Sequence, residues 1–194
     1  HAMIKISSSS SNFGLILEKA LSEAFPQELV SVTNGGGAIS DAFCRLAFDK
    51  LIFTGSTNVG KTVMSAAAEN LVPLILELGG KSPVLVHPSI HLRDVAQRIA
   101  AGKLWNAGQT CVAPDYMFLP KGKTAEFIEH FRECVEEMYP DILHNPDYTS
   151  IINDRQYNRL QSYLENAREH GAQVVEINPA HETFSDTRKV PPTL

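Results

Sequence analysis

Cysteine and long apolar runs are scarce in this chain, and each scarcity excludes a class of protein. The 194 residues contain three cysteines, Cys44, Cys111 and Cys134. Their odd number and wide spacing fit neither a disulfide framework nor a CxxC metal or redox pair, so at least one thiol stays free. No apolar run approaches the roughly 20 residues of a bilayer-spanning helix, and the first residues lack the apolar core of a signal peptide. We therefore expect a cytoplasmic protein with no membrane partner.

The charge balance excludes a second group of functions. The net charge is -5 and the isoelectric point is about 5.8. A mildly acidic surface gains nothing from a polyanion, so we expect no nucleic-acid partner. We also expect no metal site, because Pro88 interrupts any helix that would place His87 and His91 on one face.

Strand-like and helix-like segments alternate along most of the chain. Helices are expected at 12–25, 39–47, 60–70, 91–107, 124–138 and 155–170, and strands at 29–33, 51–54, 73–78, 82–86, 116–119 and 173–177. Residues 1–3 resemble a cloning remnant, and we expect no regular structure in the serine run at 7–11 or in the tail from Pro179. The alternation predicts an α/β fold, a three-layer arrangement of a parallel sheet with helices on both faces.

Residues 55–62 read GSTNVGKT and satisfy the GxxxxGK[ST] pattern of a triphosphate-binding loop, between an expected strand and an expected helix. Glycines and small hydroxyls at a helix N-terminus expose backbone N–H groups that attract phosphate, including a pyrophosphate. A P-loop-type nucleotide-binding protein is therefore one interpretation of this stretch, and an ordinary strand-to-helix turn is another. Both interpretations leave the strings LELGGKSP (76–83) and NAGQTCVAP (106–114) without a purpose.

Two further strings carry a carboxylate and a thiol. Glu77 lies in LELGGKSP (76–83), and Cys111 lies in NAGQTCVAP (106–114). Each is set beside a glycine that lets backbone approach a ligand closely. A nucleophilic thiol and a carboxylate base are the groups needed to oxidise a carbonyl through a covalent thioester.

The strings FTGSTNVGK (53–61), LELGGKSP and GQTCVAPDY (108–116) closely resemble the aldehyde dehydrogenases, in the same order and at similar spacing. The VAPDY continuation and the KVPPT ending (189–193) resemble the class-three branch, which includes fatty-aldehyde and coniferyl-aldehyde dehydrogenases. The resemblance implies the aldehyde dehydrogenase fold and oxidation of an aldehyde substrate, coniferyl aldehyde among the candidates, to a carboxylic acid with NAD or NADP.

The resemblance also implies roles for individual residues. Cys111 matches the nucleophile, which forms a thiohemiacetal and then a thioester, and its backbone N–H matches one oxyanion contact. Glu77 matches the general base that activates the hydrolytic water. The positions that match cofactor contacts are Lys5, Gly55, Ser56, Val59, Leu78 and Gly79. Where the family has Lys-Pro-Ser-Glu, this chain has Lys5 followed by Ile-Ser-Ser. The absent acid removes a charge that would repel a ribose 2′-phosphate, so both NAD and NADP stay open.

Family enzymes are much longer and carry an upstream oxyanion asparagine and a downstream Glu-Ile-Phe-Gly-Pro-like string, which we do not find here. We therefore expect a fragment in which residues 1–79 are the later half of the dinucleotide-binding domain and residues 80–194 the first part of the catalytic domain. Alone it should have little or no dehydrogenase activity, and the parent enzyme should be a homo-oligomer.

The remaining residues receive structural interpretations. Cys44 and Cys134 are expected to be inert thiols, as most cysteines in apolar sequence are. Trp105, just before the thiol motif, is expected to pack in the core rather than to line a substrate tunnel. Lys61 and Lys81 are expected to be structural or to face solvent.

Overall fold

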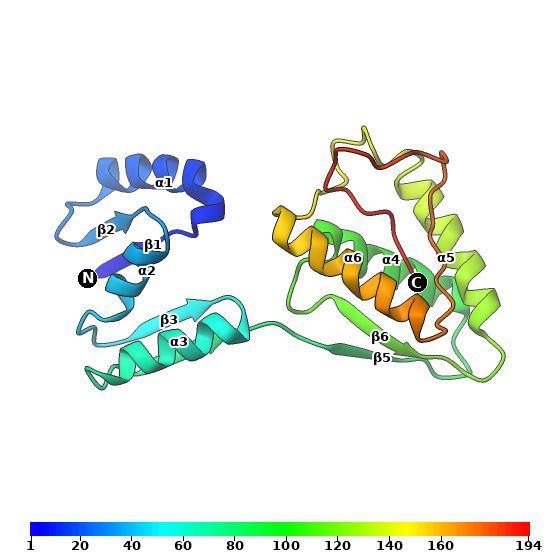
Figure 1. The fold of residues 1–194 in the computed structure, drawn as a ribbon, viewed down its shortest axis with the longest axis horizontal. Helices are drawn as coiled ribbons and strands as arrows, with labels where there is room; N and C mark the ends of the chain where they lie inside the picture. Colours follow the sequence, from blue (N-terminus) through cyan, green and yellow to red (C-terminus); the bar gives the residue numbers. More distant parts are fainter. The chain divides into compact units, whose positions relative to one another are not determined.

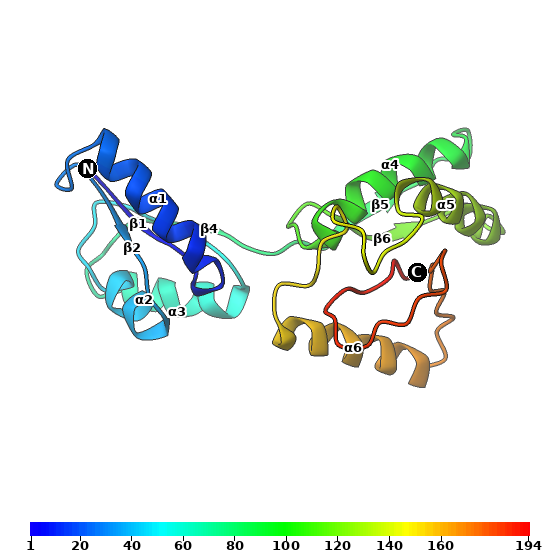
Figure 2. The ribbon, with the colours of Figure 1, turned by 90° about the horizontal axis from the view of Figure 1, so that it is seen from above.

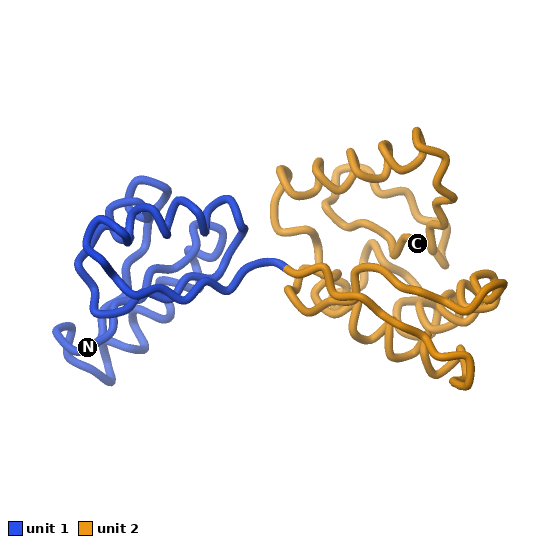
Figure 3. The backbone as a smooth tube through the Cα atoms, turned by 90° about the horizontal axis from the view of Figure 1, so that it is seen from below, with its two compact units in different colours: residues 1–79 blue, residues 80–194 orange.

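The computed structural model describes residues 1–194, which divide into two compact units, His1–Gly79 and Gly80–Leu194 (Figure 3). Both units alternate strands with helices, and every strand pair is parallel. The predicted α/β class is confirmed. In this chain the strands form three separate parallel pairs.

The first unit contains four strands and three α-helices (Figure 1). They are β1 (Ala2–Lys5), α1 (Ser11–Ala24), β2 (Val30–Thr33), α2 (Gly37–Cys44), β3 (Leu51–Thr54), α3 (Thr57–Ala68) and β4 (Leu74–Glu77), with a short 3₁₀ turn at Ser8–Ser10. β1 pairs with β2, and β3 pairs with β4 in a register that sets Thr54 opposite Glu77. Because the strands of a pair are parallel, β3 and β4 end at the same edge.

Helix α3 packs through a face of small and branched residues. Gly60, Val63, Ala66 and Ala67 are buried at helical spacing. Val63 and Ala67 join a small core that also contains Phe43, Leu51 and Val72. A Cβ atom at position 60 would lie 2.9 Å from Leu78 Cδ2, so glycine lets the first turns of α3 approach the end of β4 closely.

The second unit is built around one parallel pair and two packed helices. Its elements are β5 (Ser82–Leu85), α4 (Leu92–Leu104), a 3₁₀ turn (Trp105–Gly108), β6 (Pro114–Phe118), α5 (Thr124–Met138) and α6 (Asp154–Glu169). β5 pairs with β6, and α4 lies beside α5 (Figure 2). Ten buried residues form the core: Leu92, Val95, Ala96, Ala100, Leu104, Phe127, Phe131, Cys134, Val135 and Ile177.

Most element bounds agree with the sequence predictions within a few residues, but three expectations were wrong. The strand expected at 173–177 is replaced by an isolated antiparallel bridge between Glu176 and Thr193. Val175 and Ile177 do bond with the tail, but Pro191 and Pro192 have no N–H to extend a ladder. At the other end of the chain, residues given no structure form β1, whose Ala2–Lys5 backbone pairs with β2.

The serine run is also more ordered than predicted. The Ser7 hydroxyl caps the 3₁₀ turn at Ser8–Ser10 by accepting a hydrogen bond from the Ser9 N–H (3.3 Å), and α1 begins at Ser11 without a side-chain cap. Short hydroxyl side chains cap the first turn of a helix in this way. None of the helices in the chain combines the length and apolar character that crossing a membrane requires.

Candidate active site

The turn between β3 and α3 places the N-terminus of a helix directly after a strand, which is a geometry that binds anions. The Gly55 N–H donates to the Glu77 carbonyl oxygen (3.0 Å), which ties the turn to the end of β4. A Cβ atom at position 55 would lie 2.5 Å from Phe53 Cζ, so a larger residue would displace that ring. Ser56 is the N-cap of α3, and its hydroxyl accepts from the Val59 N–H (3.4 Å). The other N–H groups of this first turn have no partner within the helix and suit an anion.

Glu77 is the last residue of β4. Exposure alternates along this strand, and the Glu77 side chain is on the exposed face, where no protein group donates a hydrogen bond to it. Leu78 is half-buried and meets the position of Gly60, whereas Gly79 is exposed, with open space where a Cβ atom would stand. The structure therefore brings Gly55, Glu77 and Leu78 together at one edge of the β3–β4 pair.

Lys5 lies at the end of β1 with its ammonium group bonded to backbone. Its Nζ donates to the carbonyl oxygens of Ile6 (2.6 Å) and Gly35 (2.9 Å). These bonds fasten the end of β1 to the turn after β2, a role that the sequence did not indicate. A lysine ammonium has three donors, so one remains for a ligand. A cofactor contact for Lys5 stays a prediction.

Cys111 is presented by an unusual stretch of backbone. After α4 the chain passes through three consecutive left-handed residues, Asn106 (φ 53°), Ala107 (φ 51°) and Gly108 (φ 73°). Residues 110–113 then form a turn closed by the Ala113 N–H and the Thr110 carbonyl (3.2 Å). The Cys111 side chain is exposed, and its backbone N–H has no acceptor in the protein. Thiol and free N–H are thus offered by the same residue.

Two residues that sequence reasoning gave no role hold this turn. A Cβ atom at Gly80 would lie 2.0 Å from the Cys111 carbonyl oxygen, so only glycine allows the backbone at position 80 to meet the thiol turn. The Gln109 side chain forms hydrogen bonds to main-chain groups that precede and follow the turn in sequence, at Asn106, Ser150 and Ile152. The Gly79-Gly80 pair in LELGGKSP was a sequence signal that could have indicated the close approach of backbone at Gly80. No local pattern signals Gln109, because two of its partners lie about 40 residues downstream.

The other two thiols differ from Cys111. Cys134 is buried in the core of the second unit, and Cys44 is half-buried against the core of the first. Burial raises the pKa of both thiols, with the Asp41 carboxylate adding to the effect at Cys44 and Glu137 at Cys134. A smaller thiolate fraction makes them poor nucleophiles, as predicted.

The expectation for Trp105 was wrong, because its side chain is 71% exposed. The buried face of α4 runs through Val95, Ala100 and Leu104, and Trp105 is off that face where the backbone leaves the helix. Lys81 faces solvent, as predicted, and pairs with Asp115 (2.7 Å). The hydrogen bond to that carboxylate raises the Lys81 pKa.

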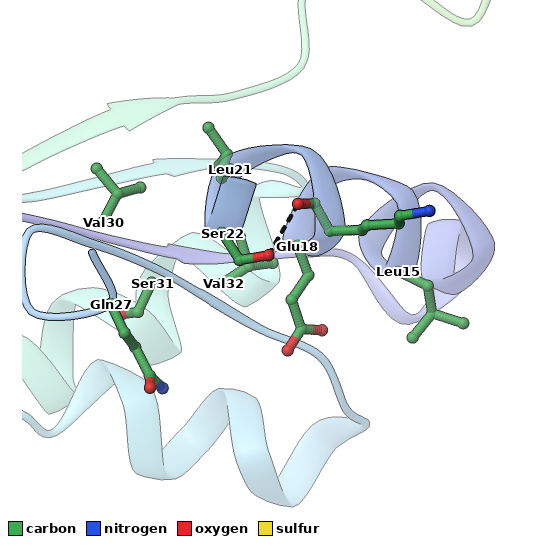
Figure 4. A pocket seen from close by; sticks show the side chains of 9 residues that line it. Leu15, Glu18, Leu21, Ser22, Gln27, Val30, Ser31 and Val32 are labelled. Atoms are coloured by element: carbon green, nitrogen blue, oxygen red, sulfur yellow. Dashed lines mark hydrogen bonds between the residues drawn. The ribbon is translucent and has the colours of Figure 1, made fainter. Parts of the chain in front are cut away.

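A cavity of about 440 Å³ lies between α1 and β2 (Figure 4). It is lined by Leu15, Glu18, Lys19, Leu21, Ser22, Gln27, Val30, Ser31 and Val32. None of the predicted site residues is among them. No group of three or more His, Cys, Asp or Glu side chains is arranged to hold a metal ion.

The candidate residues are distributed over both units. Cys111 belongs to the second unit, together with Gly80 and Gln109. Glu77 and all the predicted cofactor contacts belong to the first: Lys5, Gly55, Ser56, Val59, Leu78 and Gly79. Each unit therefore carries one part of the chemistry that the sequence motifs predict.

Comparisons with known proteins identify the family. The model of the aldehyde dehydrogenase family matches residues 1–194. The chain is 48% identical over 194 residues to a probable coniferyl aldehyde dehydrogenase of Pseudomonas aeruginosa, covering 99% of this chain and 40% of that protein. The chain thus spans about 40% of the length of the curated relatives it matches.

Solved structures agree. A substrate-bound Staphylococcus aureus AldH superposes with a TM-score of 0.87 at 37% identity, over 99% of this chain and 41% of that one. A Mycobacterium tuberculosis aldehyde dehydrogenase complexed with NAD⁺ gives 0.85 at 26% identity, over 98% and 40%. Because the family model matches every residue, this chain belongs to the aldehyde dehydrogenase family.

Proposed function

We propose that this chain is the part of an NAD(P)-dependent aldehyde dehydrogenase that carries its nucleophile, its general base and its phosphate-binding turn. The observation that carries the proposal is Cys111, an exposed thiol beside a free backbone N–H in a turn shaped by Gly80 and Gln109. The other two thiols are packed against the cores. The family match makes aldehyde oxidation the chemistry to expect from such a thiol.

The mechanism follows from what these residues can do. The Cys111 thiolate adds to the aldehyde carbon, and its own N–H donates to the resulting oxyanion. A bound nicotinamide dinucleotide supplies the hydride acceptor. Loss of hydride leaves an acyl thioester on Cys111. Glu77 takes a proton from water, which hydrolyses the thioester and releases the carboxylic acid.

The first unit suits a dinucleotide phosphate. A larger residue at position 55 would displace the Phe53 ring. Ser56 caps α3, and the remaining N–H groups of that helix point out of its first turn. We propose that Gly55, Ser56 and Val59 approach the pyrophosphate side, Leu78 and Gly79 the nicotinamide side, and Lys5 the adenosine ribose. Residues 1–79 are then the cofactor part and residues 80–194 the catalytic part. We prefer this to a nucleoside triphosphate, because it also gives Glu77 and Cys111 a function.

The substrate proposal is an aromatic α,β-unsaturated aldehyde. It is supported by the 48% identity to a probable coniferyl aldehyde dehydrogenase. A panel of coniferyl aldehyde, benzaldehyde and decanal, assayed with the chain extended to the length of its relatives, tests it. We expect the highest kcat/KM for coniferyl aldehyde, and a preference for decanal would overturn this assignment.

The nucleophile is tested on the chain itself. Peptide mapping after timed exposure to iodoacetamide at neutral pH should show Cys111 alkylated about tenfold faster than Cys44 and Cys134, because the thiolate is the reactive form and theirs is suppressed. Equal rates at all three thiols would contradict the proposal. In the extended protein, Cys111→Ser should abolish aldehyde-dependent reduction of NAD⁺, whereas Cys134→Ser should leave this chemistry in place.

A further inference from the structure

The side chain of Gln109 links the thiol turn to a distant segment of the second unit. Its Nε2 donates to the carbonyl oxygens of Asn106 (3.1 Å) and Ser150 (3.1 Å), and its Oε1 accepts from the Ile152 N–H (2.9 Å). One amide therefore uses both its donor and its acceptor on main-chain groups. No other side chain forms a hydrogen bond between the stretch before Cys111 and residues 150–152.

The far anchor of this link is itself fixed. Ile151 exchanges two hydrogen bonds with Arg188: its N–H donates to the Arg188 carbonyl (2.9 Å), and its carbonyl accepts from Arg188 Nε (2.9 Å). Ile151 is buried, and the next residues lead into α6, where Asn153 caps the helix by accepting from the Gln156 N–H (3.0 Å). Gln109 thus ties the turn to a segment that is held on both sides.

The near anchor needs such a tie. Asn106 and Ala107 have left-handed backbone, which is unfavourable for an L-residue, above all for Ala107 with its Cβ atom. Backbone of this kind persists only where surrounding contacts over-determine it. The Gln109 amide bonds to the Asn106 carbonyl, and Asn106 Nδ2 donates in return to the Gln109 carbonyl (3.3 Å). These bonds close the left-handed stretch immediately before the thiol turn.

We propose that Gln109 is a positioning residue, which orients the turn so that the Cys111 thiol and the Cys111 N–H face the same substrate carbonyl. This inference rests on the proposed function, because it takes Cys111 as the nucleophile. Gly80 limits the turn at the Cys111 carbonyl, and Gln109 fixes the backbone that leads into it. Loss of the Gln109 bonds lets the N–H turn away while the exposed thiol stays reachable.

Two probes of the same thiol separate orientation from simple exposure. With p-nitrophenyl acetate, the thiolate adds to the ester carbonyl, a tetrahedral oxyanion forms and collapses, and p-nitrophenolate leaves an acetyl thioester on Cys111. With iodoacetamide, the thiolate displaces iodide and no oxyanion forms. Both rates scale with the thiolate fraction, so their ratio at Cys111 is insensitive to a change in thiol pKa and reports the oxyanion contact.

The variants are Gln109→Leu, which removes all three side-chain bonds, and Gln109→Glu, which keeps an acceptor for Ile152 and loses both donors. Gln97→Leu is the matched control, because Gln97 is exposed on α4 and its side chain has no bond in the protein. Rates at each cysteine come from quenched time courses and peptide mapping of the 194-residue chain. Cys134 reports loss of folding, since it is alkylated only when the core opens.

We expect Gln109→Leu to lower the ratio of acetylation to alkylation at Cys111 about tenfold, less than the 10²- to 10³-fold typical of deleting a whole oxyanion donor. Gln109→Glu should lower it about threefold, and Gln97→Leu should leave it unchanged. If Gln109→Leu exposes Cys134 and so fails to fold, the Gln109→Glu result decides. An unchanged ratio in a folded Gln109 variant would overturn the positioning role.

The same data separate this inference from the proposed function. Suppose that wild-type Cys111 has the same ratio of acetylation to alkylation as N-acetylcysteine and is alkylated no faster than Cys44. That result would refute Cys111 as an activated nucleophile. An elevated wild-type ratio that survives both Gln109 substitutions would refute only the role of Gln109.

Discussion

The two units hold their candidate site residues by different means. In the first, Gly55, Ser56 and Glu77 take their places from elements that adjoin them in sequence: the ends of two paired strands and the cap of one helix. In the second, Cys111 depends on contacts from far along the chain, with Gly80 at its carbonyl and Gln109 bonded to residues 150 and 152. Local rules are therefore enough to anticipate the first arrangement, whereas the second exists only once the unit is folded.

The cores differ as well. Five buried residues form the cluster in the first unit, and ten form the one in the second. In the first unit, α1 also carries large exposed side chains, among them Phe13 (57%) and Ile16 (69%). We expect the second unit to keep its fold under conditions that open the first, because buried apolar area is the main source of stability.

The largest effect should come from the core of the second unit. Phe127 is 1% exposed and stacks on Phe131 at a centroid distance of 5.9 Å. Phe127→Ala should lower the free energy of unfolding of that unit by about 3–5 kcal/mol, the usual cost of removing a buried ring. Phe118→Ala is the control, because that side chain is 59% exposed. Equal losses in chemical denaturation of the two variants would contradict the description of the core.

A smaller effect is expected where Gly80 contacts the thiol turn within the second unit. Gly80→Ala places a Cβ atom against the Cys111 carbonyl and should cost about 1–3 kcal/mol, as overpacking does. Gly79→Ala is the matched control, because nothing lies within 4 Å of its Cβ position. Urea unfolding should distinguish the two adjacent alanines. If both are neutral, Gly80 does not constrain the thiol turn.

The cap of α3 tests the local arrangement in the first unit. Ser56→Ala removes the acceptor for the Val59 N–H and should lower the unfolding free energy by about 0.5–1 kcal/mol. Ser65→Ala, within the same helix, removes only a hydroxyl bonded back to the Lys61 carbonyl and should cost less. Thermal unfolding followed by circular dichroism measures the loss of unfolding free energy in both variants. A larger loss of unfolding free energy for Ser65→Ala than for Ser56→Ala would contradict the assignment of Ser56 as the cap of α3.

The smallest expected effect is a pH dependence of stability. Burial raises the pKa of the Cys134 thiol in the folded chain. In the unfolded chain this thiol ionises near its ordinary pKa of about 8.5, so its contribution is complete below that pH and declines as the pH rises toward the folded-state value. Cys134→Val should remove this part of the decline in unfolding free energy between neutral and alkaline pH. The same slope in both proteins would show that the thiol ionises equally in both states.

Sequence reasoning succeeded where one short segment determines the outcome. The helix at Thr124–Met138 and the strand at Leu51–Thr54 have the predicted bounds, since periodicity and turn residues mark both ends. The roles that the family motifs imply for Glu77 and Cys111 stay predictions. The resemblance to aldehyde dehydrogenases is confirmed by the family match.

It failed where the outcome depends on partners elsewhere. The pairing of Ala2–Lys5 with β2 and the reduction of an apolar run to a bridge with Thr193 are set by residues distant in sequence. Trp105 was assigned to the core by its type, yet its position on α4 is off the buried face. Gln109 was part of a recognised motif, but its role depends on main-chain groups at 150 and 152.

The central claim is that Cys111 carries the acyl group of an oxidised aldehyde and that Glu77 is needed to release it. The most direct measurement is mass spectrometry of peptides containing Cys111, after acid quench of the Glu77→Gln variant with NAD⁺ and coniferyl aldehyde, in the chain extended to the length of its relatives. We expect an acyl thioester on Cys111 that accumulates in this variant and not in the wild type. Normal turnover by the variant, or an acyl group on another residue, would contradict it.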